Sequence, residues 1–415
     1  MIKKVAFNIG YPIENPINGA DYDIIYAFEP NEFLFNELVS KSSVKYECFR
    51  LSISDKNGYL SSEVQTIRLD TFMIEKSISH INFLKIEEKI KGLSVIKSIG
   101  DLIKNVDIIE LCSDSSDKEN IINYLDSKGF KLADEFFVSN KKENLKFKRV
   151  FIPVIGVPIL NGTNWLKRLI DSVDIPVDRL LIINNNGLSE IDSELNKLKS
   201  SNELIKKVDI LNMPGNIGVA SSWNLIIKSF IMKPYWVISN HDVCFTPGLL
   251  RELYDKAENS KIDIVFGSGG DFGQGSYDLF LIKDSVVKKI GLFDENCYPA
   301  YCEDVDYIMR ITRWDWDNPE TKINKSLLNK AYYHGNKLSN ETDYYGDGSQ
   351  TKKENSELSK KLDDVNLTNF EYMEKKWGPG WRMSNPSIYP MGIKGIPLTY
   401  TSFDIEFVRK KYLGF

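Results

Sequence analysis

Short apolar runs alternate with amphipathic stretches in the first third of the chain. The apolar runs predict strands over 24–28, 44–53, 65–69, 82–86 and 106–111. The amphipathic stretches predict helices around 33–39, 93–99 and 118–127, and residues 131–150 predict two strands around a polar turn. Strands and helices in alternation indicate a doubly wound, Rossmann-like α/β domain over residues 1–148.

The same alternation starts again near residue 150. Strands are predicted over 150–157, 179–183, 207–211 and 236–238, and helices from 164, over 191–199 and over 217–230. Each strand is followed by a polar turn. Because strands in such a series are parallel, the turns are expected along one edge of the sheet, where open α/β sheets bind their ligands. The fold class is therefore predicted to be two α/β domains in tandem.

The last of these strands leads into Asp242. Residues 236–238 are apolar, and the four that follow, SNHD, are polar. A carboxylate is therefore expected at the end of a buried strand, and capping of the turn is its alternative role. Thr246 and Pro247 then predict the start of a helix, with Thr246 as its N-cap.

Length and composition narrow the class of protein. A chain of 415 residues is expected to form two or three domains. The net charge of −5 argues against a general nucleic-acid-binding protein. No apolar run is long enough for a membrane span, and MIKKVAFNIG is too short for a secretory signal, so a cytoplasmic location is expected. The 5 scattered cysteines are expected to be free thiols.

Four segments in the first domain resemble the ordered landmarks of FkbM-type methyltransferases. They are AFEPN (27–31), TIRLDTF (66–72), FLKI (83–86) and IIE (108–110). The resemblance implies that Glu29 would hold the ribose of S-adenosylmethionine.

The same domain departs from that family's pattern in two places. The family's Gly-rich turn is replaced by NIGYP (8–12). Lys89 stands where the family has an acid, and Ile90 stands where it has a glycine. A degenerate domain is therefore expected, one that serves as a scaffold or docking surface and does not use S-adenosylmethionine.

Over about 150–340 the chain resembles the nucleotide-sugar half of family 2 GT-A glycosyltransferases. The matching pieces, in order, are VPILNG, INNNG, NMPGNIGVASSWN, SNHDV, GSGGDF, GLFDENCYPAYCEDVDYIMRI and AYYHGNK. The resemblance implies a GT-A domain over 149–345. It implies transfer of a sugar from a nucleotide-diphosphate sugar, with a UDP-sugar expected, to a hydroxyl group of a glycan or other acceptor.

The resemblance also implies a set of donor-binding residues. They are Pro158, Asn161, Asn185, Asn186, Asn216, Gly218, Asn224, Asn240, His241, Gly269 and Gly270. Amides stand at 184–186, where the family often has an acid against the nucleotide base. The identity of that base is therefore left open. A simple Asn-rich turn is the alternative for 184–186, and close helix–strand packing is the alternative for Gly218.

Asp242 and His334 match the family's metal-binding positions. A carboxylate and an imidazole, with two phosphate oxygens, suit Mn²⁺, with Mg²⁺ as the other choice. The ion would neutralise the leaving nucleoside diphosphate. A core histidine bonded to backbone is the alternative for His334.

Asp304 matches the family's catalytic acid. An ionised carboxylate beside the anomeric carbon can take the proton of the attacking hydroxyl, and attack opposite the diphosphate inverts the configuration. Glu303 is the alternative base, and Asp306 is expected to orient its neighbours. Acids in a first helical turn also stabilise the helix, which is the structural alternative. Trp314 and Trp316 are expected either to stack on acceptor sugars or to be buried by packing within the protein.

Residues 346–415 are expected to form a C-terminal extension. It would comprise part of a polar flap (335–356), a helix (358–376) and a tail that wraps a domain or mediates homo-oligomer formation. Two other functions stay open. One is a non-catalytic sugar- or nucleotide-binding protein on a decayed GT-A fold. The other is a bifunctional glycosyltransferase and O-methyltransferase.

Overall fold

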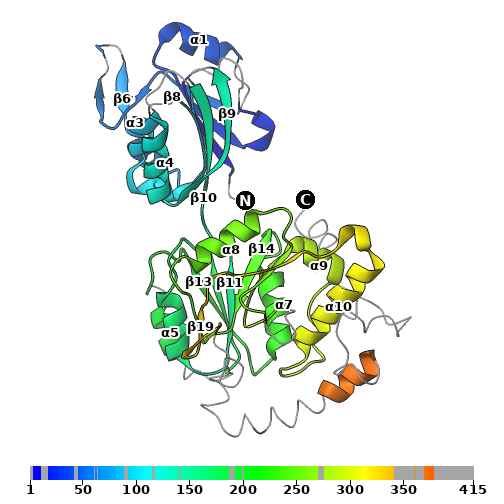
Figure 1. The fold of residues 1–415 in the computed structure, drawn as a ribbon. Coiled ribbons are helices and arrows are strands. Elements are labelled where there is room, and N and C mark those ends of the chain that lie inside the picture. Colours follow the sequence, from blue (N-terminus) through cyan, green and yellow to red (C-terminus); the bar gives the residue numbers. More distant parts are fainter. Residues whose placement is uncertain are drawn as a thin grey trace. The chain divides into compact units, whose positions relative to one another are not determined.

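The computed structural model divides into two compact units, Met1–Val150 and Phe151–Phe415. It describes residues 3–10, 17–41, 45–59, 61–62, 64–87, 92–114, 117–139, 142–186, 192–198, 201–269, 275–340, 360 and 369–377. Each unit contains its own seven-stranded, mostly parallel sheet with helices packed on it (Figure 1). The predicted α/β class is thus confirmed.

The sheet of the first unit has the strand order β3-β2-β1-β7-β8-β10-β9. Its strands are β1 (Val5–Ile9), β2 (Ile24–Phe28), β3 (Tyr46–Phe49), β7 (Ile81–Ile86), β8 (Val106–Asp114), β9 (Phe130–Ser139) and β10 (Lys142–Arg149). A small sheet contains β4 (Ser52–Ile53), β5 (Gly58–Tyr59) and β6 (Gln65–Ile67). The helices are α1 (Glu32–Lys41), α2 (Leu69–Glu75), α3 (Gly92–Lys97), α4 (Lys118–Ser127), η1 (Gly19–Asp21) and η2 (Gly100–Asn105).

Three features of this unit differ from the prediction. Strand β1, buried throughout between β2 and β7, was not among the predicted strands. The single strand predicted over 44–53 is split between β3 and β4, which belong to different sheets. The strand predicted over 65–69 ends at Ile67, because Arg68 pairs with Asp70 (Nε–Oδ1 3.0 Å) in the first turn of α2.

The sheet of the second unit has the order β13-β12-β11-β14-β17-β16-β18. Its strands are β11 (Ile155–Ile159), β12 (Leu180–Asn184), β13 (Val208–Asn212), β14 (Tyr235–Ser239), β16 (Ile264–Phe266), β17 (Leu279–Lys283) and β18 (Lys325–Leu327). Strands β11 to β14 are parallel, and β17 is antiparallel to β14. A small sheet joins β15 (Val243–Cys244), β19 (Tyr333–His334) and β20 (Lys337–Leu338).

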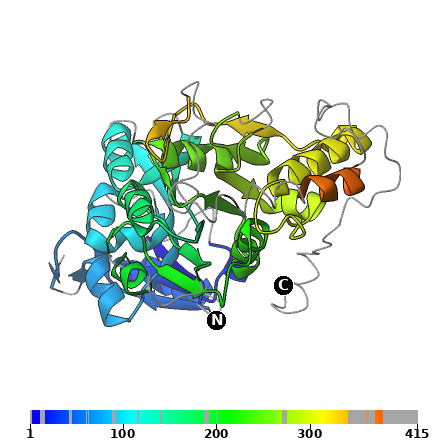
Figure 2. The same ribbon diagram turned by 90° about the horizontal axis from the view of Figure 1, so that it is seen from below.

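Helices cover this second sheet. They are α5 (Thr163–Asp171), α6 (Asp192–Leu198), α7 (Val219–Ser229), α8 (Leu249–Glu258), α9 (Asp284–Ile290), α10 (Glu303–Asp317) and η5 (Pro319–Thr321). Residues 369–377 form a further helical segment that lies beside α10 in both views (Figures 1 and 2). None of the helices that the structure describes combines the length and the apolar character needed to cross a lipid bilayer.

Several predicted boundaries in this unit are wrong. The strand expected over 150–157 begins at Ile155. The helix expected at Thr246 begins at Leu249, because the Thr246 hydroxyl donates to the carbonyl of Ala331 and does not cap the helix. The expected flap beyond residue 340, and most of the helix expected over 358–376, lie outside the described residues.

Candidate active site

Two neighbouring strands of the small sheet bring Asp242 and His334 into contact. Asp242 lies in the turn between β14 and β15, and β15 pairs with β19 so that Val243 is opposite His334. His334 Nε2 is 3.1 Å from Asp242 Oδ1. The Asp242 side chain is 3% exposed, and its backbone carbonyl accepts the Gly335 N–H at 2.8 Å. The pair is therefore a rigid, buried acid–imidazole couple.

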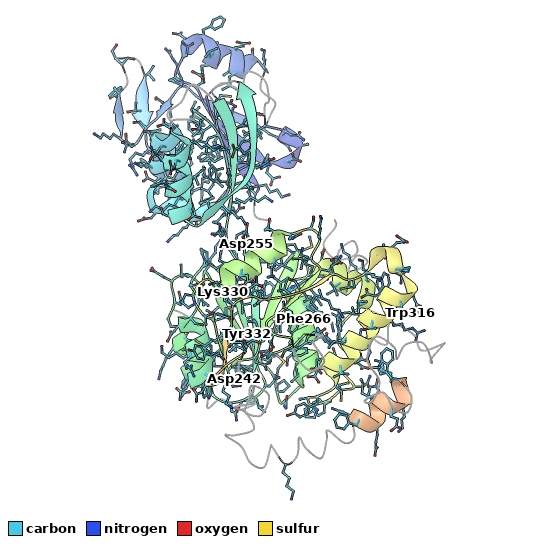
Figure 3. The ribbon with its side chains drawn as sticks, in the orientation of Figure 1. Asp242, Asp255, Phe266, Trp316, Lys330 and Tyr332 are labelled. Carbon is cyan, nitrogen blue, oxygen red and sulfur yellow. The ribbon has the colours of Figure 1, made fainter. Side chains whose placement is uncertain are left out.

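Asp278, which the sequence analysis missed, sits on the other side of this imidazole. Its Oδ2 is 3.4 Å from His334 Nδ1. The Tyr332 hydroxyl donates to both Asp278 oxygens, at 2.9 and 2.8 Å. Figure 3 shows Tyr332 and Asp242 in the same part of the second unit. A carboxylate behind a histidine fixes the orientation of its ring, as the outer partner of a metal ligand does.

The Asp242–His334 pair fits a divalent metal ion by its chemistry and spacing. Two adjacent ligands of an octahedral ion, each at about 2.1 Å, lie roughly 3.0 Å apart. The observed 3.1 Å between Nε2 and Oδ1 agrees with that spacing. Among the described residues, no group of three or more His, Cys, Asp or Glu side chains is arranged to hold an ion. Asp242 and His334 are thus the candidate ligands among the described residues.

The acidic start of α10 carries the two predicted candidates for the base, Glu303 and Asp304. Glu303 is buried, and its Oε2 has no hydrogen-bond partner within the described part of the chain. Burial raises the pKa of Glu303 well above its ordinary value, and the nearby charge of Asp304 raises that pKa further. Asp304 is only partly buried, and its Oδ1 accepts the Val305 N–H at 2.8 Å. Of the two neighbouring acids, Glu303 is therefore the one whose charged form is disfavoured by its surroundings.

Two of the predicted donor-binding amides hold the fold together. Asn224 Oδ1 accepts the Phe293 N–H at 2.8 Å, and its Nδ2 donates to the Phe293 carbonyl at 2.9 Å. Asn185 Nδ2 donates to the Ser222 hydroxyl at 2.9 Å. Both side chains are buried and engaged within the protein. Both amides therefore make structural contacts, and their predicted contact with a donor stays a prediction.

Amide oxygens of two other predicted residues are available at the ends of neighbouring strands. Asn161 follows β11 and Asn186 follows β12. Their Oδ1 atoms are buried, and neither has a hydrogen-bond partner in the part of the chain that the structure describes. Asn186 Nδ2 donates to the Leu160 carbonyl at 2.8 Å, which sets the direction of that amide. Pro158, also predicted, lies inside β11 opposite Ile183.

The turn before α7 requires a glycine. Gly218 has a φ of 86°, and a Cβ there would lie 3.0 Å from both the Pro299 carbonyl oxygen and a Tyr298 ring carbon. The predicted alternative, close packing, is therefore what the structure shows, although the neighbour is the 298–299 segment and not a strand. Asn216 supports the turn, since its Oδ1 accepts the Gly218 N–H at 2.9 Å.

The remaining predicted residues fall into three groups. Asn240 and His241 lie in the turn before Asp242, where the Asn240 N–H donates to the Asp278 carbonyl at 2.7 Å and His241 is buried. The Gly269 carbonyl accepts the Gly275 N–H at 2.7 Å. Gly270 lies outside the described residues.

Neither predicted tryptophan borders the acids of α10. Trp316 is 56% exposed but lies about 20 Å along the helix from Glu303. Figure 3 shows Trp316 well away from Asp242. Trp314 packs on the core of the second unit and donates its Nε1–H to the Thr321 carbonyl at 3.1 Å. Of the two predicted alternatives, packing is what the structure shows for Trp314.

Comparison with known proteins shows similarity to a glycosyltransferase. The chain is similar to a galactofuranosyl glycosyltransferase of Leishmania donovani, with 24% identity over 43% of this chain and 57% of that protein. The chain thus spans little more than half the length of this curated relative. No family model matches it.

The solved structures to which the chain is similar include the following three. One is a mannosyltransferase from Pyrobaculum calidifontis in complex with GDP-Man and Mn²⁺, at 12% identity and a TM-score of 0.33, covering 42% of this chain and 55% of that one. Another is TarS 1–349 of S. aureus in complex with UDP-GlcNAc, at 14% identity and a TM-score of 0.34, covering 44% and 57%. A ribosomal protein L11 methylase from Lactobacillus delbrueckii matches at 9% identity and a TM-score of 0.24, covering 36% and 72%.

Proposed function

We propose that the second unit is a glycosyltransferase that takes its sugar from a nucleotide-diphosphate sugar. The observation that carries the proposal is the buried Asp242–His334 pair at the end of β14, oriented from behind by Asp278. Similarity to a galactofuranosyl glycosyltransferase supports the same reaction. A galactofuranosyl donor is therefore the first donor to test, followed by UDP- and GDP-linked hexoses.

Asp242 and His334 would hold a divalent ion, Mn²⁺ or Mg²⁺, with donor phosphates and water as its other ligands. Such an ion stabilises the charge of a leaving nucleoside diphosphate. Asp278 keeps the His334 ring turned so that Nε2 faces Asp242. The Oδ1 atoms of Asn161 and Asn186, which lack a partner among the described residues, would accept hydrogen bonds from the donor's base.

Asp304 is the proposed general base. Its carboxylate is partly exposed, whereas the raised pKa of Glu303 keeps that neighbour protonated over a wider pH range. Asp304 would take the proton of an acceptor hydroxyl while the hydroxyl oxygen bonds to the anomeric carbon and the bond to the diphosphate breaks. Attack from the face opposite the diphosphate would invert the configuration at that carbon.

Asp304→Asn tests this assignment. The variant should bind donor as the wild type does, because Asp242 and His334 are unchanged, and its transfer rate should fall by about a hundredfold or more. Donor binding would be measured by calorimetry and transfer by release of nucleoside diphosphate. Asp317→Asn, at the other end of the same helix, is the matched control. Normal turnover by Asp304→Asn would remove it as the base.

A second candidate is a binding protein that has lost transfer activity. It is favoured by Asn240, which replaces an acid that the family carries two positions before Asp242. The same experiment separates the two, because metal-dependent donor binding without turnover by the wild type would favour this candidate.

For the first unit we propose a scaffold role without S-adenosylmethionine. The Glu29 carboxylate, predicted to match a ribose-binding acid, accepts the Asn31 N–H at 2.8 Å. Calorimetric titration with S-adenosylmethionine should give no binding heat. A clear binding isotherm would instead favour the bifunctional enzyme.

A further inference from the structure

Residues 369–377 pack against the start of α10, although they lie far beyond the end of that helix in the sequence. Met373 and Trp377 are buried in a cluster with Cys297, Cys302 and Met309. Figures 1 and 2 both show this helical segment beside α10. The segment therefore contacts the loop that precedes Glu303 and the first turns of the helix that follows.

Lys376 joins two carboxylates that are fully buried. Its Nζ lies 2.7 Å from Asp294 Oδ2 and 2.6 Å from Asp306 Oδ1. Asp306 also receives Arg310 Nε at 2.8 Å. Two acids are thus balanced by two bases in a site where each side chain is 2% exposed or less. A buried carboxylate without its cation is strongly unfavourable, so Lys376 ties the segment to α10.

Two aromatic side chains of the segment donate hydrogen bonds to the same two carboxylates. Trp377 Nε1–H donates to Asp306 Oδ1 at 2.9 Å, and the Tyr372 hydroxyl donates to Asp294 Oδ2 at 2.7 Å. Because the acceptors are charged, these hydrogen bonds are stronger than neutral ones. They hold the segment in one orientation against α10.

Asn369 holds the turn that leads into the candidate base. Its Nδ2 donates to the carbonyls of Ala300 and Tyr301, at 2.9 and 3.1 Å. Tyr301 and Cys302 have φ values of 77° and 76°, a left-handed conformation that residues with a side chain adopt only where their surroundings enforce it. These two residues come directly before Glu303 and Asp304. Asn369 therefore supports the strained turn that aims Asp304.

We propose that residues 369–377 are a positioning element for Asp304, with Lys376 and Asn369 as its positioning residues. Lys376 fixes the first turns of α10 through Asp306, and Asn369 fixes the turn before it. Neither residue is expected to touch the donor. The donor is proposed to bind through a metal ion held by Asp242 and His334. The proposal rests on the proposed function for the role of Asp304, but the placement of the 300–306 segment can be measured without any activity.

The test uses the full chain with Lys376→Met and Asn369→Ala, and Lys375→Met as the control, because Lys375 is the exposed neighbour. Lys376→Met should lower kcat by about a hundredfold, the loss expected from a misplacement near 1 Å. Asn369→Ala should lower kcat by about tenfold, since one side chain of the same element is lost. Metal-dependent donor binding should stay at the wild-type value in both variants.

Hydrogen exchange supplies the independent readout. Amides over 301–306 should exchange faster in both variants than in the wild type and the Lys375→Met control, while those over 240–244 should not change. Asn369→Ala removes no buried charge and is therefore expected to fold. If Lys376→Met does not fold, Asn369→Ala alone tests the positioning role. Unchanged exchange and kcat would overturn the proposal. A parallel loss of kcat, donor binding and melting temperature would also overturn it, because it would indicate a stabilising role only.

The two proposals fail in different ways. Absence of transfer by the wild type with every donor tested would reject the proposed function. In that case, faster exchange confined to 301–306 in Asn369→Ala would still support the positioning role. Unchanged exchange there would reject it as well.

Discussion

At the scale of single residues, the acids of the second unit differ because their surroundings differ. Asp242 faces an imidazole, whereas Asp278 accepts hydrogen bonds from Tyr332 on both oxygens. Glu303 is buried beside another acid, and Asp306 is buried between cations. Burial without a cation favours the protonated form of Glu303. Acidic side chains of one unit therefore differ in what they can do.

Asp278→Asn should weaken metal binding without unfolding the protein. The amide keeps an acceptor for Tyr332 but loses the carboxylate that orients His334. Loss of such a partner lowers metal affinity by about 10- to 100-fold. Titration with Mn²⁺ followed by calorimetry would measure the change, with Asp255→Asn on α8 as the control. Wild-type Mn²⁺ affinity in Asp278→Asn would remove Asp278 from the site.

Glu303→Gln should stabilise the protein increasingly as the pH rises. The pKa of Glu303 is raised in the folded protein, first by burial and then by Asp304, so the folded state keeps its proton above the unfolded pKa of about 4.3. The wild type therefore loses stability as the pH rises above that value, and the neutral glutamine does not.

Melting temperatures measured across the pH range would show the effect. The difference between Glu303→Gln and the wild type should vanish at low pH and grow toward neutral pH. Glu320→Gln, which replaces an exposed acid, should show no such trend. A difference that is the same at every pH would contradict the assignment.

At the scale of elements, α7 is tied to the segment that leads toward α10. Asn224 binds both the N–H and the carbonyl of Phe293, and its Nδ2 also donates to Glu295 Oε1 at 2.8 Å. Phe293 in turn stacks on Tyr307 of α10, with ring centroids 4.2 Å apart. Helix α7 is thus connected through Phe293 to α10, the helix that carries Asp304.

Asn224→Ala should therefore lower stability and leave the affinity for donor unchanged. It leaves a buried N–H and a buried carbonyl of Phe293 unpaired, which costs about 2–4 kcal/mol of unfolding free energy. Urea unfolding would measure the loss, with Ser229→Ala at the exposed end of α7 as the control. A weaker donor affinity with normal stability would restore the donor-binding role predicted from the sequence.

The order of the strands and the acids at their ends followed from local patterns. Hydrophobic periodicity is local, so β2 and α4 were predicted with their observed bounds, and Asp242 was expected at a strand end. Partners that meet only through tertiary packing carry no local signal. Asp278 reaches His334 because β17 pairs antiparallel to β14, and Lys376 reaches Asp306 across a long stretch of chain. The hydrogen bonds of Asn224 to Phe293 could not be predicted for the same reason.

At the scale of the whole molecule, the two compact units have separate cores. The core of the first unit includes Phe7, Phe28 and Phe72, and Phe28 and Phe72 meet edge to face with centroids 4.8 Å apart. The core of the second unit includes Trp223, Trp236 and Phe280. A unit with its own core is expected to fold without its neighbour.

A chain that begins at Phe151 should therefore fold and keep its affinity for nucleotide sugar. The proposed metal ligands and the proposed base all belong to the second unit. Calorimetry on the shortened and full chains would compare their donor affinities. Loss of donor binding by a folded second unit would show that the first unit contributes to the site.

The central claim is that Asp242 and His334 hold the metal ion that binds the donor diphosphate. Its most direct test is calorimetric titration of a nucleotide sugar, with and without Mn²⁺, into the wild type and Asp242→Ala. The wild type should bind the donor far more tightly with Mn²⁺, and Asp242→Ala should lose that dependence on Mn²⁺. Equal Mn²⁺ dependence in both proteins would contradict the account.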